Sequence, residues 1–254
     1  MLLAQTQLNA STLGRQTVDL LLHRAPSASL LTLLFATIAA RLHFVTIGGA
    51  IAGSFLSIVI YVSAGPGGFA ALGMVFALTA AATRIGYARK ERLGAHEQKT
   101  GRRAMQVLAN LSLAALFSLL SITLARPWLL ICATAALAEA ASDTVSSELG
   151  EAWADRVYLV TTFKHVALGT DGGISLAGTL AGLAASVIVA WVSYMFHVVP
   201  RYGAVLAAGA AFLGTFVDSL LGATMERRGW LNNNAVNFLS TGAAAGLAAA
   251  LLAI

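Results

Sequence analysis

Charged residues are scarce in this sequence. Asp, Glu, Lys and Arg together make up 11% of its 254 residues, whereas a soluble globular domain carries roughly 25%. So few charges cannot solvate a water-facing surface, and no long polar stretch is present that could form a separate soluble domain. Hydrophobic residues make up 58% of the chain. The composition therefore predicts lipid as the solvent around most of the protein.

Paired cysteines and clustered histidines are also absent from the sequence. The single cysteine, Cys132, lies in an apolar run, which excludes an intrachain disulfide and a cysteine-based zinc cluster. The five histidines are scattered and show no metal-ligand spacing. We therefore expect neither a disulfide scaffold nor a histidine metal site, and we expect Cys132 to be a small core residue.

Basic residues are concentrated in one short interval. The formal net charge is +5, and seven of the sixteen Lys and Arg lie between Arg84 and Arg103. A basic loop flanked by apolar helices marks membrane topology more often than nucleic-acid binding, so we predict no nucleic-acid partner. Short loops rich in Lys and Arg stay inside the cell, which predicts a cytoplasmic loop in a membrane of the bacterial inner-membrane type.

Long apolar runs predict an all-α, polytopic transmembrane bundle of about seven or eight spans. A helix needs about 20 apolar residues to cross the hydrocarbon layer. By that rule six spans are clear, and they cover residues 44–63, 69–84, 107–124, 175–196, 204–221 and 236–254. Two shorter runs, residues 27–40 and 128–141, are expected to be further spans, tilted or broken. Together these runs predict a single membrane domain over residues 27–254.

Two boundaries follow from proline. Residues 1–26 contain polar side chains before any apolar stretch of signal-peptide length, and we expect a surface segment that ends at Pro26. Pro66 is flanked by three glycines, a pattern that predicts a tight turn between two successive spans.

Counting spans from the basic loop predicts where the polar residues gather. The count places residues 142–173 and 225–235 on the same side of the membrane as the basic loop. Together with the basic loop, these segments contain or adjoin most of the acidic and amide residues. The sequence therefore predicts a polar site at the cytoplasmic face.

The first candidate cluster of this site is acidic. Glu139 and Asp143 are four residues apart, so they share one face of a helix. An ionisable group at such a position needs a partner or access to water. Asp143, Glu148 and the serines between them offer the hard oxygen ligands that Mg²⁺ prefers. The alternative is an ordinary helix end at the membrane interface with solvated carboxylates.

The second cluster is rich in glycine and follows Lys164. Glycines let backbone N–H groups turn toward an anion, and the helix that begins after Ser175 adds a positive dipole. The segment is similar in kind to a phosphate cradle, although the same glycines could form a simple turn. Its candidate binding residues are Gly169, Thr170, Gly172 and Gly173.

The third cluster combines an acid with asparagines. Asp218 is expected in the last turn of its span, where a carboxylate opposes the helix dipole and needs a metal ion or a cationic side chain to stabilise it. Asn232 and Asn234 precede the last span. Capping of that helix explains one asparagine well but not the whole group.

The fourth cluster ends the basic loop. Arg102 and Arg103 can bind phosphate groups, although anionic lipid headgroups explain them equally well. Asn110 enters the following span without a polar neighbour in sequence, which makes it a further candidate for the site.

Six ordered segments resemble a family of integral membrane proteins long described as of unknown function, which includes the plant phytyl-phosphate kinase of vitamin E synthesis and transmembrane protein 19. They are residues 83–90 (TRIGYARK), 101–110 (GRRAMQVLAN), 141–150 (ASDTVSSELG), 169–179 (GTDGGISLAGT), 218–224 (DSLLGAT) and 231–234 (LNNN). The resemblance runs from about residue 40 to the C-terminus. It implies a kinase that converts a phytyl-type isoprenyl monophosphate to the diphosphate with a nucleoside triphosphate, CTP being a plausible donor.

Phosphoryl transfer needs positioning, a metal ion and cations on the phosphate oxygens more than covalent chemistry. On this hypothesis Asp143, Glu148 and Asp218 hold Mg²⁺. Donor and acceptor phosphates are bound by Lys164, Arg102, Arg103 and the 169–173 backbone, and the donor is oriented by Asn110, Asn232 and Asn234. The isoprenyl tail lies between helices, among membrane lipids.

Two other classes of protein stay open at this point. A small-solute or ion transporter would use the same carboxylates as ion sites, with helices broken at the glycine-rich segment. A non-catalytic lipid-binding or scaffold protein would keep its function without Asp143 and Glu148. The sequence also leaves open whether the chain forms a homo-oligomer.

Overall fold

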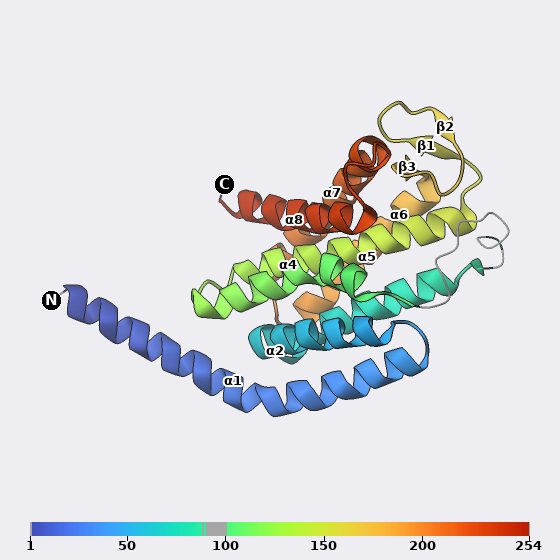
Figure 1. Cartoon of the computed structure of the whole chain (residues 1–254). Helices are drawn as coiled ribbons and strands as arrows, with labels where there is room; N and C mark the ends of the chain where they lie inside the picture. The colour runs from blue at the N-terminus through green and yellow to red at the C-terminus, as the bar shows by residue number, and fades with distance from the viewer. Residues whose placement is uncertain (1, 88, 90–100, 254) are drawn as a thin grey trace.

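A computed structural model describes residues 2–87, 89 and 101–253, with side chains placed from residue 18 onward except at residue 21. The middle of the basic segment 84–103 therefore lies outside the described residues. The described chain is a bundle of long helices with a small sheet at one end, and both termini lie at the opposite end (Figure 1).

Seven long helices form the bundle. They are α1 (Leu2–Arg41), α2 (Ile47–Arg84), α4 (Ala104–Thr123), α5 (Leu129–Trp153), α6 (Leu176–Met195), α7 (Arg201–Leu221) and α8 (Asn233–Leu252), with a short π-helix, η1 (Gly222–Glu226), directly after α7. In the described part of the chain, seven helices are long and apolar enough to cross a membrane. The predicted all-α membrane bundle of seven or eight spans is confirmed.

α2 consists of two helical halves that fold back on each other. The backbone N–H of Thr46, which precedes α2, donates to the Arg102 carbonyl, and the Thr79 hydroxyl, near the other end of α2, accepts a bond from the Arg102 guanidinium. A straight helix would separate residues 46 and 79 by about 50 Å. The reversal occurs at Gly65, whose φ of 73° and ψ of −169° are not helical, immediately before Pro66. The predicted turn between two spans is therefore present.

Both ends of α2 contact Arg102: Thr46 bonds to its backbone carbonyl, and Thr79 bonds to its side chain. At the reversal, Arg24 of α1 donates to the carbonyls of Val62 and Ser63 at 3.0 and 3.3 Å. These carbonyls lie where the helix stops, and a buried carbonyl without a donor is costly. Arg24 thus ties α1 to the turn of α2.

α1 does not end at the predicted boundary. The helix is continuous from Leu2 to Arg41 with Pro26 inside it, so Pro26 is not a boundary of secondary structure. Proline bends a helix more often than it ends one when the surrounding packing continues, and α1 changes direction along its length (Figure 1). The division into a surface segment 1–26 and a membrane domain 27–254 stays a prediction.

α5 lies at the centre of the bundle. In its most apolar stretch 78% of the residues are buried, against 39% or less for the other candidate spans. Its alanine-rich first half lets α2, α4, α6, α7 and α8 approach closely. The span expected over residues 128–141 is present in α5 and is not broken, because the helix runs on to Trp153.

Small residues fill the interior, and large apolar residues face outward. Ala135, Ala136, Ala207 and Ala245 have no exposed surface, whereas leucines and isoleucines are exposed on the outer helices. Examples of the exposed set are Leu30 at 70%, Ile47 at 79% and Leu176 at 78%. This inversion is expected when the solvent is lipid, because small residues let helices pack and large ones lie among acyl chains.

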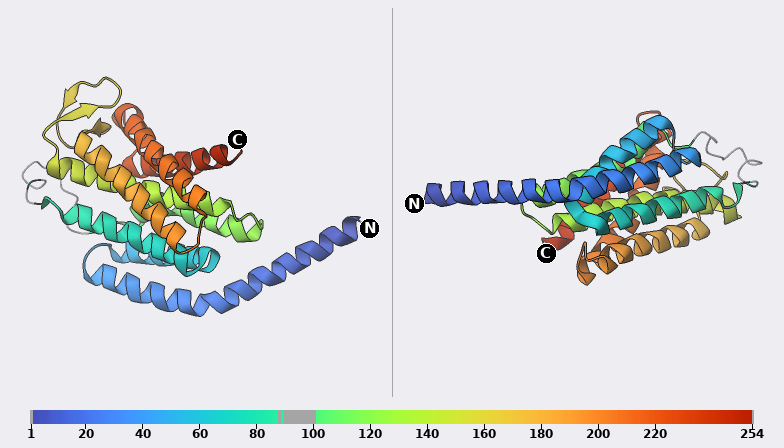
Figure 2. Two further views of the ribbon diagram at one scale, coloured as in Figure 1. Left: turned by 180° about the vertical axis from the view of Figure 1, so that it is seen from behind. Right: turned by 90° about the horizontal axis from the view of Figure 1, so that it is seen from below.

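The sheet was not anticipated from the sequence. β1 (Val157–Leu159), β2 (His165–Val166) and β3 (Gly173–Ile174) form an antiparallel sheet in the order β2-β1-β3, with Tyr158 opposite both His165 and Ile174. Strands of two or three residues are too short to show a period-two pattern. Figure 2 shows from behind that this sheet covers the end of the bundle beside α6 and α7.

The described end of the basic segment, the end of α5, the loop before β3 and η1 lie together at that end. Arg89 donates to the carbonyls of Ala152 and Ala154 at the end of α5. Gly172, before β3, lies against Ala223 of η1. The loops that span counting places on one side therefore share one end of the bundle, here called the polar end. That this end faces the cytoplasm stays a prediction.

Candidate functional site

A large cavity opens at the polar end. It has a volume of about 1400 Å³ including its mouth, and its walls come from α4, α5, α7, η1, α8 and the segment that leads to β3. Nine of the residues singled out in the sequence line it: Arg102, Asn110, Asp143, Glu148, Gly169, Thr170, Gly172, Gly173 and Asp218. The fold thus brings together residues from four segments that are far apart in the chain.

Four other predicted residues do not line this cavity. Lys164 is exposed in the turn between β1 and β2, and Arg103 is exposed at the start of α4. Asn232 caps α8 by accepting a bond of 3.0 Å from the Ala235 N–H, and Asn234 lies beside it. Their predicted roles in phosphate and donor binding stay predictions.

Different asparagines from the same segment reach the cavity. Asn233 and Asn237 line it, and they are four residues apart on one face of α8. The i to i+4 spacing was the signal that could have selected them over Asn232 and Asn234. The same spacing joins Gln106 to Arg102 and Asn110, and Ser219 to Thr215.

Two carboxylates form the centre of the cavity. Asp143 comes from α5 and Asp218 from the last turn of α7, and their carboxyl groups lie within hydrogen-bonding reach of one another. The Thr215 hydroxyl donates to Ser142 Oγ at 2.8 Å and so joins the two helices beside the pair. Two adjacent carboxylates repel unless a proton or a cation lies between them.

Two acceptor atoms beside this pair have no hydrogen-bond partner among the described residues. They are Asp218 Oδ2 and Asn237 Oδ1, both buried. The amide of Asn237 donates to Asn110 Oδ1 at 3.2 Å, which fixes which way its oxygen points. Buried polar atoms are nearly always paired, and both of these can only accept. A ligand that suits them brings donors or a metal cation.

The charge on the cavity wall favours cations. Six carboxylates line it, from Asp143, Glu148, Glu151, Asp171, Asp218 and Glu226. Arg102 is the one Lys or Arg among the described lining residues. A bare phosphate would be repelled by such a wall, whereas a phosphate accompanied by a divalent cation would not.

The oxygen donors fit Mg²⁺ only together with a ligand. No group of three Asp, Glu, His or Cys among the described residues is close enough to hold a metal ion alone. Mg²⁺ in phosphoryl-transfer sites is bound by one or two carboxylates and completed by water and substrate phosphates. The Asp143–Asp218 pair meets that requirement, and Glu148 is held elsewhere on the wall by the Thr83 hydroxyl at 2.9 Å.

The glycine-rich segment packs closely against η1 and forms part of the cavity wall. Gly172 has φ of +74°, and a Cβ on it would lie 2.4 Å from Ala223 and 2.5 Å from the Ser219 carbonyl. The N–H of Gly173 donates to the Thr170 carbonyl at 2.8 Å. That N–H is therefore engaged within the turn, and an anion would have to use other donors of the segment.

Arg102 is held by its backbone as well as its side chain. Its N–H donates to the Phe44 carbonyl and its carbonyl accepts from the Thr46 N–H, both at 3.0 Å. Gly101, at φ +77°, passes so close to His43 and Phe44 that no side chain fits there. With the 3.1 Å bond to Thr79, these contacts place the guanidinium on the Asp143 side of the cavity, where the two side chains interact electrostatically.

Glu139 is a buried acid that does not line the cavity. Only 1% of the residue is exposed, and its Oε1 has no hydrogen-bond partner among the described residues. Its charged neighbours are Asp143 and Asp218, and its side chain packs against Gly214 of α7. Glu139 and Asp143 lie near the middle of α5, so the acids reach deeper than the span end where the sequence placed them.

The sequence of this chain matches one family model over most of its length. Residues 30–245 match the family described as "Integral membrane protein DUF92". The chain belongs to this family. The match includes every segment that lines the polar cavity, and it makes the protein an integral membrane protein.

Individual relatives come from distant organisms. An uncharacterized membrane protein of Synechocystis sp. is 34% identical over 191 residues, which cover 73% of this chain and 74% of the relative. One of Methanocaldococcus jannaschii is 38% identical over 167 residues, or 65% of this chain and 68% of the relative. "Protein VTE6, chloroplastic" of Arabidopsis thaliana is 35% identical over 188 residues, or 69% and 56%. No solved structure matches the chain.

Proposed function

We propose that this protein is a membrane-embedded kinase that transfers a phosphoryl group from a nucleoside triphosphate, CTP in the first instance, to an isoprenyl monophosphate of the phytyl type. The observation that carries the proposal is the pair Asp143 and Asp218 at the centre of an acidic cavity that opens at one end of a membrane bundle. The likeness to VTE6 and the family segments quoted above support the same reaction class.

The carboxylates of this cavity suit a metal-bound nucleotide. Asp143 and Asp218 would hold Mg²⁺, with Asn237 Oδ1 beside them as a further acceptor. When bound, the ion neutralises charge that develops on the transferred phosphoryl group. It also compensates the negative wall, so that a triphosphate can enter a cavity with six carboxylates and one arginine.

The acceptor needs a cation but no strong base. An oxygen of the isoprenyl monophosphate is already anionic, so it can attack the γ-phosphorus directly while the bond to the β–γ bridging oxygen breaks and the nucleoside diphosphate leaves. Arg102 is the guanidinium on this wall that can bind the acceptor phosphate. Asn110 and Asn237, joined by their hydrogen bond, are positioned to orient either phosphate.

A phosphoryl-transfer assay on the purified protein in detergent tests the proposal. Phytyl, geranylgeranyl and longer prenyl monophosphates are each offered with Mg²⁺ and CTP, ATP, GTP or UTP, and diphosphate is detected by mass spectrometry. We expect a diphosphate product with wild type and none with Asp143→Asn. The absence of product from every pair, together with the absence of nucleotide binding, would refute the kinase proposal.

A cation transporter is the second candidate, and two observations favour it. Glu139 and Asp143 lie near the middle of α5, and α7 continues into the π-helix η1 four residues after Asp218. A transporter would move cations or small solutes across proteoliposome membranes without consuming nucleotide. Flux that depends on Asp143, with no nucleotide turnover, would select this function over the kinase.

A further inference from the structure

A second cavity, mostly apolar, adjoins the polar one. It has a volume of about 840 Å³ including its opening and lies between α1, the two halves of α2, and α4. Arg102, Gln106 and Asn110 line both cavities, so the two meet at these three residues. Protein interiors are close-packed, and a space of this size is in the range of ligand pockets.

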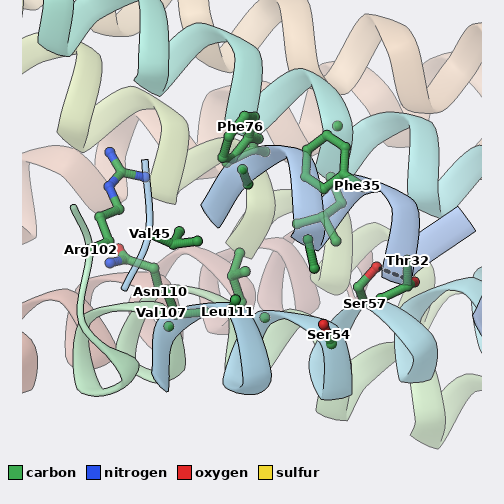
Figure 3. Close-up of a pocket in the computed structure, with 18 of the residues that line it drawn as sticks. Thr32, Phe35, Val45, Ser54, Ser57, Phe76, Arg102, Val107, Asn110 and Leu111 are labelled. Carbon is green, nitrogen blue, oxygen red and sulfur yellow. Dashed lines mark hydrogen bonds between the residues drawn. The ribbon is translucent and has the colours of Figure 1, made fainter. Parts of the chain in front are cut away.

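The apolar cavity extends from Arg102 to a pair of hydroxyl groups. Figure 3 places Arg102 and Asn110 at one end, Phe35 and Phe76 along the wall, and Thr32 with Ser57 at the other end. The Thr32 and Ser57 hydroxyls share a buried hydrogen bond of 3.0 Å, so each is paired with the other. On the first half of α2 the wall runs from Gly49 to Ser57, which is about 12 Å of helix.

We infer that this cavity binds the isoprenoid tail of a prenyl monophosphate whose phosphate lies at Arg102 in the polar cavity. The inference rests on the proposed function for the identity of the lipid. A single amphiphile with one phosphate and one long apolar chain matches a polar cavity and an apolar cavity that meet at a fixed arginine.

Substitutions at Gly73 can fill this cavity with side chains of increasing size. Gly73 lines the apolar cavity, and a Cβ built on it meets no atom within 4 Å. Larger side chains at this position therefore enter the cavity before they meet protein. Gly246 on α8 is a matched control, because its Cβ is equally free but it is exposed on the outer face and lines none of the described cavities.

The experiment measures lipid binding without nucleotide, so that it does not depend on turnover. Wild type and the series Gly73→Ala, Gly73→Leu and Gly73→Phe are titrated with geranyl and geranylgeranyl monophosphate, with geranylgeraniol and dioleoyl phosphatidate as comparison lipids. We expect affinity for geranylgeranyl monophosphate to fall with side-chain size, by about tenfold or more at Leu, because part of the tail is expelled. We expect a smaller loss for geranyl monophosphate, because its shorter tail occupies less of the cavity.

Gly246→Leu should leave both affinities unchanged, and equal melting temperatures for the two Leu variants show that Gly73→Leu is folded. Equal losses for short and long tails, or no loss at all, would overturn the tail site. Equal competition by phosphatidate would assign the cavity to bulk lipid and also overturn it. Binding that follows the predicted size series without diphosphate formation would support the tail site while the kinase proposal fails.

Discussion

The polar and apolar cavities use different parts of the chain and different side chains. The polar cavity is built from α5, α7, η1, α8 and the glycine-rich segment, with six carboxylates on its wall. The apolar cavity is built from α1, α2 and α4, with phenylalanines and small residues on its wall. Among the described residues, Arg102, Gln106 and Asn110 line both cavities.

That difference separates two kinds of contribution to function. Groups in the polar cavity act on phosphates, so their loss should affect all lipid substrates alike. Groups in the apolar cavity contact only the tail, so their effect should depend on tail length. This separation would be contradicted if a change in the polar cavity had an effect that depends on tail length, or if a change in the apolar cavity affected all tail lengths alike.

The largest effect is expected from the central carboxylates. Asp143→Asn and Asp218→Asn remove a negative charge without changing size, and we expect each to lower kcat/KM by about 100- to 1000-fold for every tail length. Asp155→Asn is the control, because that side chain is 95% exposed and forms an ion pair of 3.7 Å with Arg89. A loss that varied with tail length would show that the pair acts on the tail site.

A smaller effect is expected from the glycine that packs the loop onto η1. Gly172→Ala adds a Cβ that would overlap Ala223 in addition to the cost of φ +74°, whereas Gly229→Ala has φ of +73° but open space. We expect about 1 kcal/mol of destabilisation at Gly229 and about 2 kcal/mol more at Gly172. Chemical unfolding of the detergent-solubilised protein measures both. Equal destabilisation would mean that the loop does not pack on η1.

Neighbouring arginines give the next contrast. Arg102→Gln removes the guanidinium shared by the two cavities, and we expect KM for the lipid monophosphate to rise about tenfold. Arg103→Gln, one residue away but exposed, should change it less than about twofold. Steady-state kinetics with saturating nucleotide measure both. A comparable rise at Arg103 would argue for phosphate binding outside the cavity.

Two buried hydroxyl pairs give the smallest contrast. Thr215→Val breaks the bond to Ser142 beside the carboxylates, and Ser57→Ala breaks the bond to Thr32 at the end of the apolar cavity away from Arg102. Each should cost about 1 kcal/mol of stability. Only Thr215→Val should also lower kcat, by a few fold and for every tail length, because it loosens the α5–α7 contact. A similar kcat loss in Ser57→Ala would contradict the separation of the cavities.

Much of the fold could be predicted because membrane insertion is a local property. Span length and apolar runs identify each helix, and Pro66 with its glycines marks the turn inside α2. The differences from the structure concern chain continuation. Pro26 does not end α1, and α5 continues to Trp153, since packing against neighbouring helices outweighs the local polar signal.

The site was predictable to the level of segment but less so to the level of residue. Asp143, Asp218 and Arg102 were selected because charges in apolar surroundings are costly and need a reason to be there. Asn233 and Asn237 were not separated from Asn232 and Asn234, because which asparagine faces inward depends on where α8 begins and how it is rotated. Lys164 depends on the β1–β2 turn, which has no sequence signature of its own.

The sequence by itself determined the solvent, the helices and the side of the bundle on which polar groups gather, because hydrophobicity and span counting act along the chain. Only the tertiary structure decided that Asp143 meets Asp218, that Arg102 is fixed between both ends of α2, and that an apolar cavity joins the polar one there. These relations depend on helix rotation and on the fold-back at Gly65, which bring together residues that no local pattern connects.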